Sequence, residues 1–221
     1  LTDQDAATIA AHLTPRIWVL AQDDATNNDY TILRYTGGDA LLQGAHIYAH
    51  TRYQKSTIEW RCAMHTPSGL AGQRDLVDLL PYDARKAWPG NSINISASKP
   101  PLRVAKELSS RLLGYYLPAY RLSMQALQDE AAQHAADDAL ALELGALLGK
   151  SPDQIALTGR ARNGRTYDHA WFCCSEGTAL GMRKLSIQHG RVEFERLSLT
   201  PQQAREFLAL VMQWAEQENA Q

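Results

Sequence analysis

Alternation of apolar and polar residues predicts antiparallel strands in the first third of the chain. In residues 45–54 the polar rings of His46, Tyr48 and His50 alternate with apolar side chains, and residues 57–65 show the same alternation. This period of two is what a sheet with one buried and one wet face requires. Further strands are predicted at residues 16–22, 30–35, 91–98, 167–175, 179–188 and 191–197.

Apolar residues at helical spacing predict helices between and after these strands. They are expected at residues 3–13, 102–116, 119–148 and 200–214. Gly114 and Pro118 predict a break or a bend between the second and the third of these helices. The predicted fold class is therefore α+β, with antiparallel sheets, strand-into-helix units at 93–113 and 192–214, and a long central helical insertion.

The length of 221 residues fits one large domain, so we expect a single domain over 1–221. The two strand-into-helix units are alike, because Ala-Lys-Glu-Leu at 105–108 corresponds to Ala-Arg-Glu-Phe at 204–207. A pseudo-duplication of 1–116 and 167–221, with a helical insertion at 119–158, accounts for this likeness, and so does coincidence.

The composition is that of a globular protein without bulk basicity. The formal net charge of −2 excludes a histone-like protein but allows a local basic face. No apolar run is long enough to predict a membrane span. The polar, acidic start at Leu1-Thr2-Asp3 is unlike a secretory signal, and an odd number of cysteines, with Cys173 next to Cys174, favours reduced thiols in the cytoplasm.

Charge is segregated along the sequence, since residues 99–121 and 150–165 are basic and residues 129–143 are acidic. Cations in such segments contact phosphates. The candidate nucleic-acid-binding residues are Lys99, Arg103, Lys106, Arg111, Lys150, Arg160, Arg162 and Arg165. Tyrosines that can stack on bases lie nearby in the sequence, at Tyr115, Tyr116, Tyr120 and Tyr167. The alternative is that the basic segments are solvated helix faces paired with the acidic helix.

Two glycine-containing motifs lie around residue 149. Gly149-Lys150-Ser151 resembles the end of a P-loop, but Leu144 stands where that motif needs glycine, so no nucleotide cofactor is predicted. The spacing of Gly145, Gly149 and an apolar residue at 155 also fits a helix-turn-helix whose recognition helix begins at Pro152. An ordinary turn between two helices explains the same spacing.

Cysteine and histidine residues offer one candidate metal site. Cys62 with His65 and His169 with Cys173 supply enough ligands for a tetrahedral zinc ion if their strands are adjacent. The same residues would form a thiol dyad if the fold placed them within hydrogen-bond reach. Because none of the compact spacings of structural zinc modules is present, buried thiols with incidental histidines are the preferred interpretation, and neither a metal nor another cofactor is predicted.

One segment resembles a known group of proteins. The stretch Ile-Asn-Ile-Ser-Ala-Ser-Lys-Pro at 93–100, followed by Val-Ala-Lys-Glu-Leu at 104–108, Arg-Leu-Leu at 111–113, Tyr116 and Tyr120, is similar to a segment of uncharacterised proteins from bacteriophages and bacterial mobile elements. The resemblance covers about a third of the chain. It implies a genomic context and carries no functional residues with it.

The function predicted is that of a non-enzymatic phage or mobile-element accessory protein that binds nucleic acid through the basic helix and loop. One alternative is a protein-binding adaptor or inhibitor, for example of a host defence complex, which uses the acidic helix. Another is an unrecognised hydrolase in the Cys/His region. A dimer is compatible with each of these.

Overall fold

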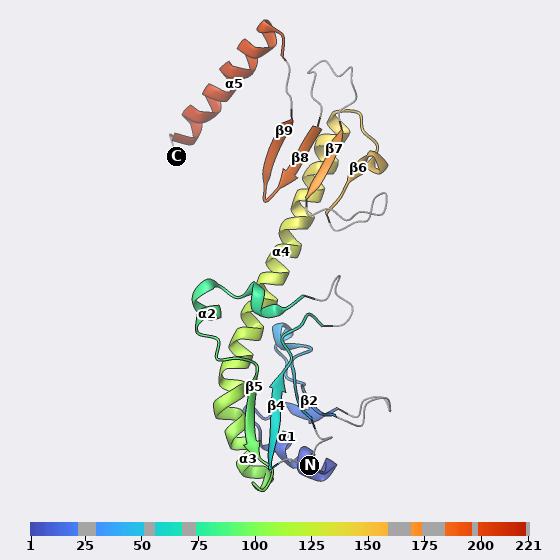
Figure 1. The fold of residues 1–221 in the computed structure, drawn as a ribbon. Helices are drawn as coiled ribbons and strands as arrows, with labels where there is room; N and C mark the ends of the chain where they lie inside the picture. The colour runs from blue at the N-terminus through green and yellow to red at the C-terminus, as the bar shows by residue number, and fades with distance from the viewer. Residues whose placement is uncertain are drawn as a thin grey trace. The chain divides into compact units, whose positions relative to one another are not determined.

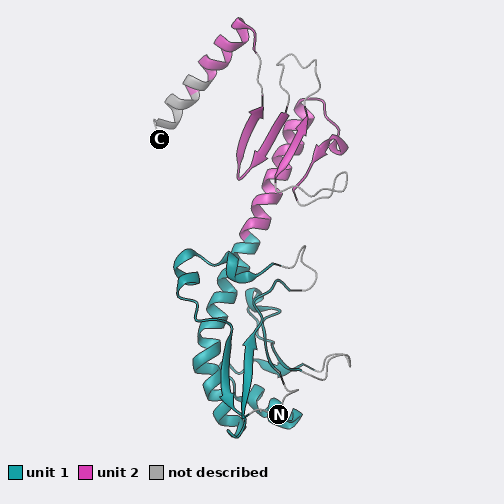
Figure 2. Ribbon diagram, in the orientation of Figure 1, with its two compact units in different colours: residues 1–128 teal, residues 129–221 magenta. Residues whose placement is uncertain are grey.

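The chain folds into two compact units, Leu1–Gln128 and Asp129–Gln221, where the sequence suggested one domain (Figure 2). The structure is a computed structural model that describes residues 1–21, 30–50, 56–67, 74–158, 169–173, 184–195 and 199–219. Each unit contains an antiparallel sheet and helical segments, which confirms the α+β fold class (Figure 1). The boundary between the units falls within the long helix α4 (Gly114–Leu147).

The first unit contains a five-stranded sheet in which neighbours in the sheet are also neighbours in the chain. Every pair of adjacent strands is antiparallel. The strands are β1 (Trp18–Leu20), β2 (Tyr30–Tyr35), β3 (His46–His50), β4 (Thr57–Cys62) and β5 (Ser92–Ser96). Between them lie the 3₁₀ turns η1 (Ala40–Leu42) and η2 (Leu76–Leu79) and the short helix α2 (Tyr82–Lys86). All five predicted strands of this region are confirmed; β2 has the predicted bounds, and β1, β4 and β5 are shorter than expected.

Two helices flank this sheet in the sequence and pack beside each other in space. Helix α1 (Asp3–His12) begins with a capping box, in which Thr2 Oγ1 accepts from the Asp5 backbone N–H and the Asp5 carboxylate accepts from the Thr2 N–H. Helix α3 (Pro101–Leu108) begins at a proline, whose fixed φ suits the first turn. Both helices contribute buried residues to the same core.

Of the break or bend predicted between the two central helices, the break is wrong. A π-helical turn, η3 (Ser109–Leu113), follows α3 directly, and α4 continues from Gly114 through Pro118. Proline removes one backbone donor and its ring crowds the carbonyl four residues earlier. We attribute the continuity to the wider π-helical turn immediately before this point, since such turns shift the helical hydrogen-bond pattern.

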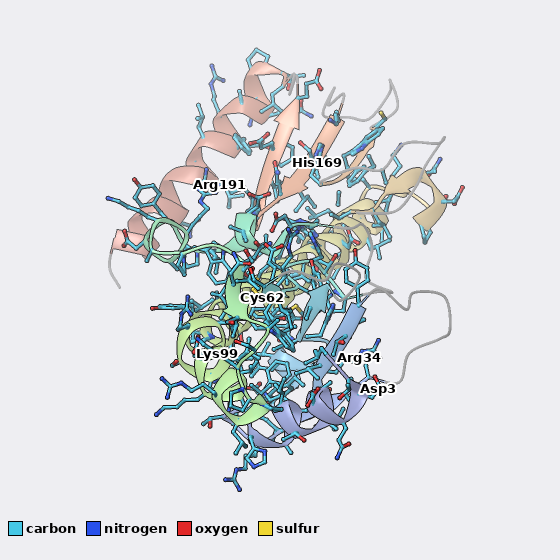
Figure 3. All side chains as sticks on the ribbon, turned by 60° about the horizontal axis from the view of Figure 1, so that its bottom comes forward. Asp3, Arg34, Cys62, Lys99, His169 and Arg191 are labelled. Carbon is cyan, nitrogen blue, oxygen red and sulfur yellow. The ribbon has the colours of Figure 1, made fainter. Side chains whose placement is uncertain are left out.

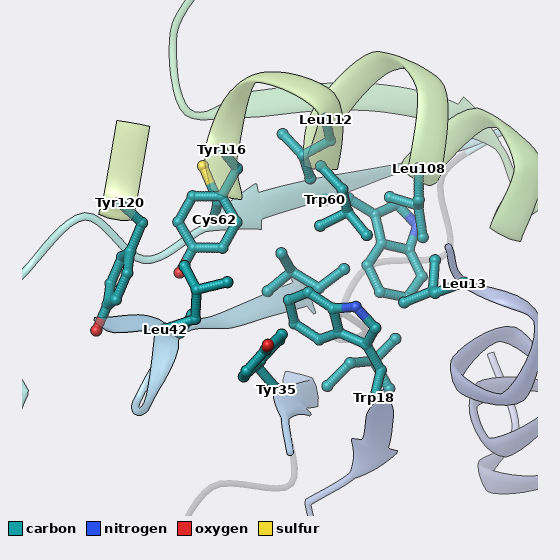
Figure 4. Packing of buried hydrophobic residues seen from close by; sticks show 14 of the residues in the cluster. Leu13, Trp18, Tyr35, Leu42, Trp60, Cys62, Leu108, Leu112, Tyr116 and Tyr120 are labelled. Atoms are coloured by element: carbon teal, nitrogen blue, oxygen red, sulfur yellow. The ribbon is translucent and has the colours of Figure 1, made fainter. Parts of the chain in front are cut away.

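The core of the first unit lies between the helices and one face of the sheet (Figure 4). Trp60 on β4 is fully buried and lies in the same cluster as Leu108 of α3 and Leu13 after α1. Tyr116 and Tyr120 of α4 belong to this cluster too. The polar residues of the alternating strands therefore fall on the opposite face of the sheet, as their period of two requires.

The second unit contains a four-stranded antiparallel sheet that is also ordered along the chain. Its strands are β6 (Ile155–Ala156), β7 (Ala170–Cys173), β8 (Lys184–Gln188) and β9 (Arg191–Glu195). His189 and Gly190 join the last two strands with φ angles of 51° and 72°, the left-handed pair that a tight hairpin turn favours. Helix α5 (Pro201–Asn219) ends the chain. The core of this sheet includes Phe172, Leu185 and Ile187, and side chains of α4 pack in the same cluster.

Neither the helix-turn-helix nor the ordinary turn between two helices that the sequence suggested around residue 149 is present. Gly149 adopts the left-handed conformation of a helix C′ residue (φ 68°), but the following segment is the 3₁₀ turn η4 (Pro152–Gln154), which leads straight into β6. No recognition helix therefore exists at 152–158. The apolar contact expected of this spacing is present, since a Cβ at Gly145 would lie 2.4 Å from Cδ1 of buried Ile155. Glycine here permits close packing of a helix against a strand.

Candidate nucleic-acid interface

The predicted basic helix is α3, and one carboxylate binds most of its cations. Glu107 accepts from Lys99 at 2.5 Å and from Arg111 at 3.0 Å, and Arg103 Nε lies 4.0 Å away. The hydrogen bond from Lys99 is the main reason why the pKa of Glu107 lies below its usual range, so the carboxylate stays charged. Lys106 is exposed on the same helix. Three of the four candidate cations of this segment therefore lie within 4.0 Å of one acid.

The tyrosines that follow α3 do not form the predicted stacking surface. Tyr116 is fully buried, where its hydroxyl donates to the Ala63 carbonyl at 3.0 Å and accepts from the His46 backbone N–H at 3.0 Å. Tyr120 is buried as well and donates to the Gln43 carbonyl. Tyr115 is exposed. Bases cannot reach the two buried rings, so their stacking role is ruled out.

The structure describes the second basic segment only up to residue 158. Arg160, Arg162, Arg165 and Tyr167 lie outside the described residues. Lys150 belongs to the second unit, whereas α3 belongs to the first. A continuous phosphate-contacting surface made from both segments therefore stays a prediction.

Two acids of the predicted acidic helix stabilise the second unit. Asp137 is buried, and its carboxylate accepts from the backbone N–H groups of His189 and Gly190, each at 2.8 Å, and from Gln133 at 3.0 Å. Asp138 accepts from the Thr158 N–H at 2.8 Å. Both carboxylates are therefore already hydrogen-bonded within the second unit, at the β8–β9 turn and just after β6. They are less available to a protein partner for this reason.

The four candidate metal ligands are divided between the two units. Cys62 and His65 lie in the first unit, and His169 and Cys173 lie in the second. Burial raises the pKa of the Cys62 thiol to about 12, so it stays protonated and is neither a ready ligand nor a nucleophile. In the part of the chain that the structure describes, no group of three or more His, Cys, Asp or Glu side chains is arranged to hold a metal ion.

A different surface combines rings and cations: the face of the first sheet opposite α1, α3 and α4. We call it the open face. It follows from the strand register, which sets Arg34 of β2 opposite His46 of β3, Ile32 opposite Tyr48, and Tyr48 opposite Arg61 of β4. Side chains of directly paired residues point to the same face. The open face carries Val19, Tyr30, Ile32, Arg34, His46, Tyr48, Glu59, Arg61 and Asn94.

Three rings form a continuous group on this open face. The rings of Tyr30 and Tyr48 meet edge to face, with centroids 5.7 Å apart and planes at 80°. His46 continues the group on β3, with its ring centroid 6.4 Å from that of Tyr48. Tyr30 is exposed, and Tyr48 and His46 are half-buried. The pair contact fixes the rings in place while part of each stays accessible to a ligand.

Cations border these rings on both sides. Arg34 is exposed beside His46, and Arg61 is exposed beside Tyr48, where it also donates to Glu59 at 3.0 Å. Figure 3 labels Arg34 and Lys99 on either side of Cys62, so that the open face and the start of α3 appear on different sides of the first unit. A nucleic acid on the open face would therefore not contact α3 at the same time.

The histidine of the ring group is uncharged at neutral pH. Burial is the main cause that lowers the pKa of His46, and nearby Arg34 and His65 lower it further, although a hydrogen bond to the Gly44 carbonyl acts in the opposite direction. A neutral imidazole offers a flat ring without adding to the charge of the surface. A nucleic acid on this face would stack its bases on the rings and contact the two arginines with its phosphates.

Tyr116 supports this surface from the core side. Its hydroxyl joins the backbone of β3, at His46, to the residue that follows β4, Ala63. We expect Tyr116→Phe to lower the free energy of unfolding of the first unit by about 1–3 kcal/mol, because a buried N–H and a buried carbonyl lose their partner. Urea denaturation followed by circular dichroism measures this loss. An unchanged stability would show that these backbone groups find other partners.

The sequence contained the signal for the open face, but not its register. The alternation of His46 and Tyr48 with apolar residues predicts both a strand and a solvent-exposed face. Which residue of β2 or β4 lies opposite each ring depends on strand pairing. The basic segment, by contrast, is visible as a run of cations in the sequence.

Comparison with protein-family models, with curated proteins and with solved structures finds no match. Within the described residues, no helix combines the length and the apolar character that crossing a membrane requires. The functional interpretation therefore depends on the side chains of the open face.

Proposed function

We propose that this protein binds single-stranded nucleic acid through the open face of its first sheet. The observation that carries the proposal is the contiguous group of Tyr30, Tyr48 and His46 rings, flanked by the guanidinium groups of Arg34 and Arg61. Unpaired bases stack on aromatic rings and on guanidinium planes, and arginine contacts the phosphates between them. A cytoplasmic location and a phage or mobile-element context belong to the same proposal.

Shape favours a single strand over a duplex. Duplex reading in the major groove requires a protruding helix or a two-stranded ribbon, and the open face is the broad side of a five-stranded sheet. The bases of a duplex are stacked on each other, so they cannot stack on Tyr48. The strands of the sheet instead present side chains in rows, along which successive unpaired bases can lie.

The first test measures binding of a fluorescent oligonucleotide by anisotropy. We expect the protein to bind 15-nucleotide oligo-dT or oligo-U at low salt, with an affinity that falls as salt is added. Tyr48→Ala should weaken binding about 10-fold or more, since one base–ring stack contributes about 1–3 kcal/mol. Arg34→Ala should weaken binding and also lower its salt dependence. A matched duplex should bind more weakly than either single strand.

Two control variants make this test specific. Tyr82→Ala removes an exposed tyrosine of the same unit that lies on α2, away from the open face, and should bind like the wild type. The triple change Arg103→Ala, Lys106→Ala and Arg111→Ala removes the cations of α3 and of the following turn η3. The proposal fails if the wild type binds neither single strand at low salt. It also fails if the triple variant loses binding while Tyr48→Ala retains it, which would favour the basic helix instead.

A further inference from the structure

One carboxylate lies among the rings and cations of the open face. Glu59 of β4 is two residues from Arg61, so both side chains point to this face. Its Oε2 atom accepts a hydrogen bond from Arg61 at 3.0 Å. A negative charge repels the phosphates of a nucleic acid, so it weakens binding unless it contacts another part of the ligand. The bases offer such a contact, because their amino groups donate hydrogen bonds.

The strand register places this carboxylate next to the central ring of the group. Arg61 is directly opposite Tyr48, and Glu59 is therefore a diagonal neighbour of Tyr48 on β4. Diagonal neighbours lie roughly 7–8 Å apart, within reach of long side chains. A base that stacked on Tyr48 would extend beyond the phenol ring. Its edge on the β4 side would then lie above Arg61 and Glu59.

The other side of Tyr48 favours this orientation of the base. Ile32 of β2 lies directly opposite Tyr48 and offers no hydrogen bond. Arg34, two residues further along β2, is exposed and can contact a phosphate. The sugar and phosphate would therefore lie toward β2, and the hydrogen-bonding edge of the base would face β4.

We infer that Glu59 and Arg61 select cytosine and adenine over uracil and thymine at the position stacked on Tyr48, an inference that rests on the proposed function of the open face. Cytosine and adenine each carry an amino donor beside a ring nitrogen that accepts. The carboxylate of Glu59 accepts from the amino group, and the guanidinium of Arg61 donates to the ring nitrogen. Uracil and thymine have a carbonyl oxygen in place of the amino group, and this oxygen and the carboxylate repel each other.

Both side chains have the capacity for these bonds. An ionised carboxylate has about four acceptor positions, and a guanidinium has about five N–H donors. The bond between Glu59 and Arg61 occupies one acceptor position and one donor. It also holds the two groups side by side, so that an acceptor and a donor are presented together to the edge of the base.

Binding of two 15-nucleotide RNAs, oligo-C and oligo-U, measured by anisotropy, tests the selection. Their bases have rings of the same size and differ in the groups that Glu59 and Arg61 contact. The wild type should bind oligo-C about 10-fold more tightly than oligo-U. Glu59→Gln keeps the shape of the side chain, but its amide can donate to the uracil oxygen as well as accept from cytosine. The preference should therefore fall to about 2-fold or less in this variant.

Asp39→Asn is the matched control. Asp39 belongs to the same unit and lies 3.6 Å from Arg121 of α4, so it is not on the open face. The variant makes the same change of charge beside an arginine, and asparagine can still cap the turn η1 as Asp39 does. It should keep the preference for oligo-C at about 10-fold.

Three results would overturn the inference, and they differ in what they mean for single-strand binding. Equal binding of oligo-C and oligo-U by the wild type removes base selection and leaves the proposed function intact. If Glu59→Gln changes both affinities by the same factor, Glu59 only positions Arg61 or contacts the ribose hydroxyl that both RNAs share. Absence of binding to both RNAs at low salt removes the proposed function together with the inference.

Discussion

The Trp60→Ala variant is expected to lose about 3–5 kcal/mol of unfolding free energy in the first unit. Trp60 is the largest fully buried side chain of the protein's described residues, and it lies in the cluster that includes Leu13 and Leu108 (Figure 4). Removing it leaves a cavity that the rigid sheet cannot close. Urea denaturation should show an earlier transition for the first unit, and the transition of the second unit should be unchanged.

Two further substitutions show whether volume causes this loss. Tyr82→Ala truncates a side chain that is 71% exposed in the same unit, and should change stability by no more than about 0.5 kcal/mol. Trp60→Phe keeps most of the ring but removes an indole N–H that has no hydrogen-bond partner. Since an unsatisfied buried donor costs about 1–3 kcal/mol, this variant should lose far less than Trp60→Ala. Equal losses for the two Trp60 variants would contradict the explanation.

The second large effect concerns the carboxylate of Asp137. Replacing it with alanine should lower the free energy of unfolding of the second unit by about 2–3 kcal/mol, because the turn N–H groups of His189 and Gly190 lose a charged acceptor. Hydrogen exchange of the β8–β9 turn should become faster in this variant. Glu143→Gln, at an exposed acid of the same helix, should leave both measurements unchanged.

The same carboxylate predicts how stability depends on pH. Burial by itself would raise the pKa of Asp137, but hydrogen bonds from Gly190, Gln133 and His189 outweigh it and hold the pKa below its usual value of 3.8. A folded-state pKa below the unfolded one means that the contribution is complete above about pH 3.8 and is lost as pH falls through the folded pKa. The Asp137→Asn variant should lack this acid-dependent loss. An identical pH profile in variant and wild type would contradict it.

Local patterns predicted the strands well, because one buried face imposes an alternation that can be read directly. The strand at β3 follows from His46 and Tyr48 alternating with apolar residues, and the pairs confirm it. Pro118 led to a wrong helix prediction because the rule that proline ends a helix considers a single residue. Whether the proline ring fits depends on the π-helical turn η3 that precedes it. The helix predicted after Pro152 is also wrong, because a capping signal marks where a helix begins and does not determine how long the helix is.

The candidate interface was harder to predict, because it depends on contacts between distant residues. The sequence around Tyr116 and Tyr120 does not distinguish them from exposed tyrosines. They are buried because α4 packs on the sheet. Glu107 reads as a single acid among cations, yet it binds Lys99 and Arg111. Conversely, Arg34 gains its importance from the residue opposite it, His46, which the register alone determines.

The order of strands in the two sheets also bears on how the chain acquires its structure. In both sheets each strand pairs with the next one in the chain, and the longest of these connections is the one from β4 to β5, residues 63–91. Short-range pairings cost little chain entropy, and proteins rich in them reach the native state quickly. During synthesis, the first sheet can be completed as soon as β5 leaves the ribosome, before any residue of the second unit is needed. Refolding of residues 1–128 alone should therefore be as fast as refolding of the same unit in the whole chain.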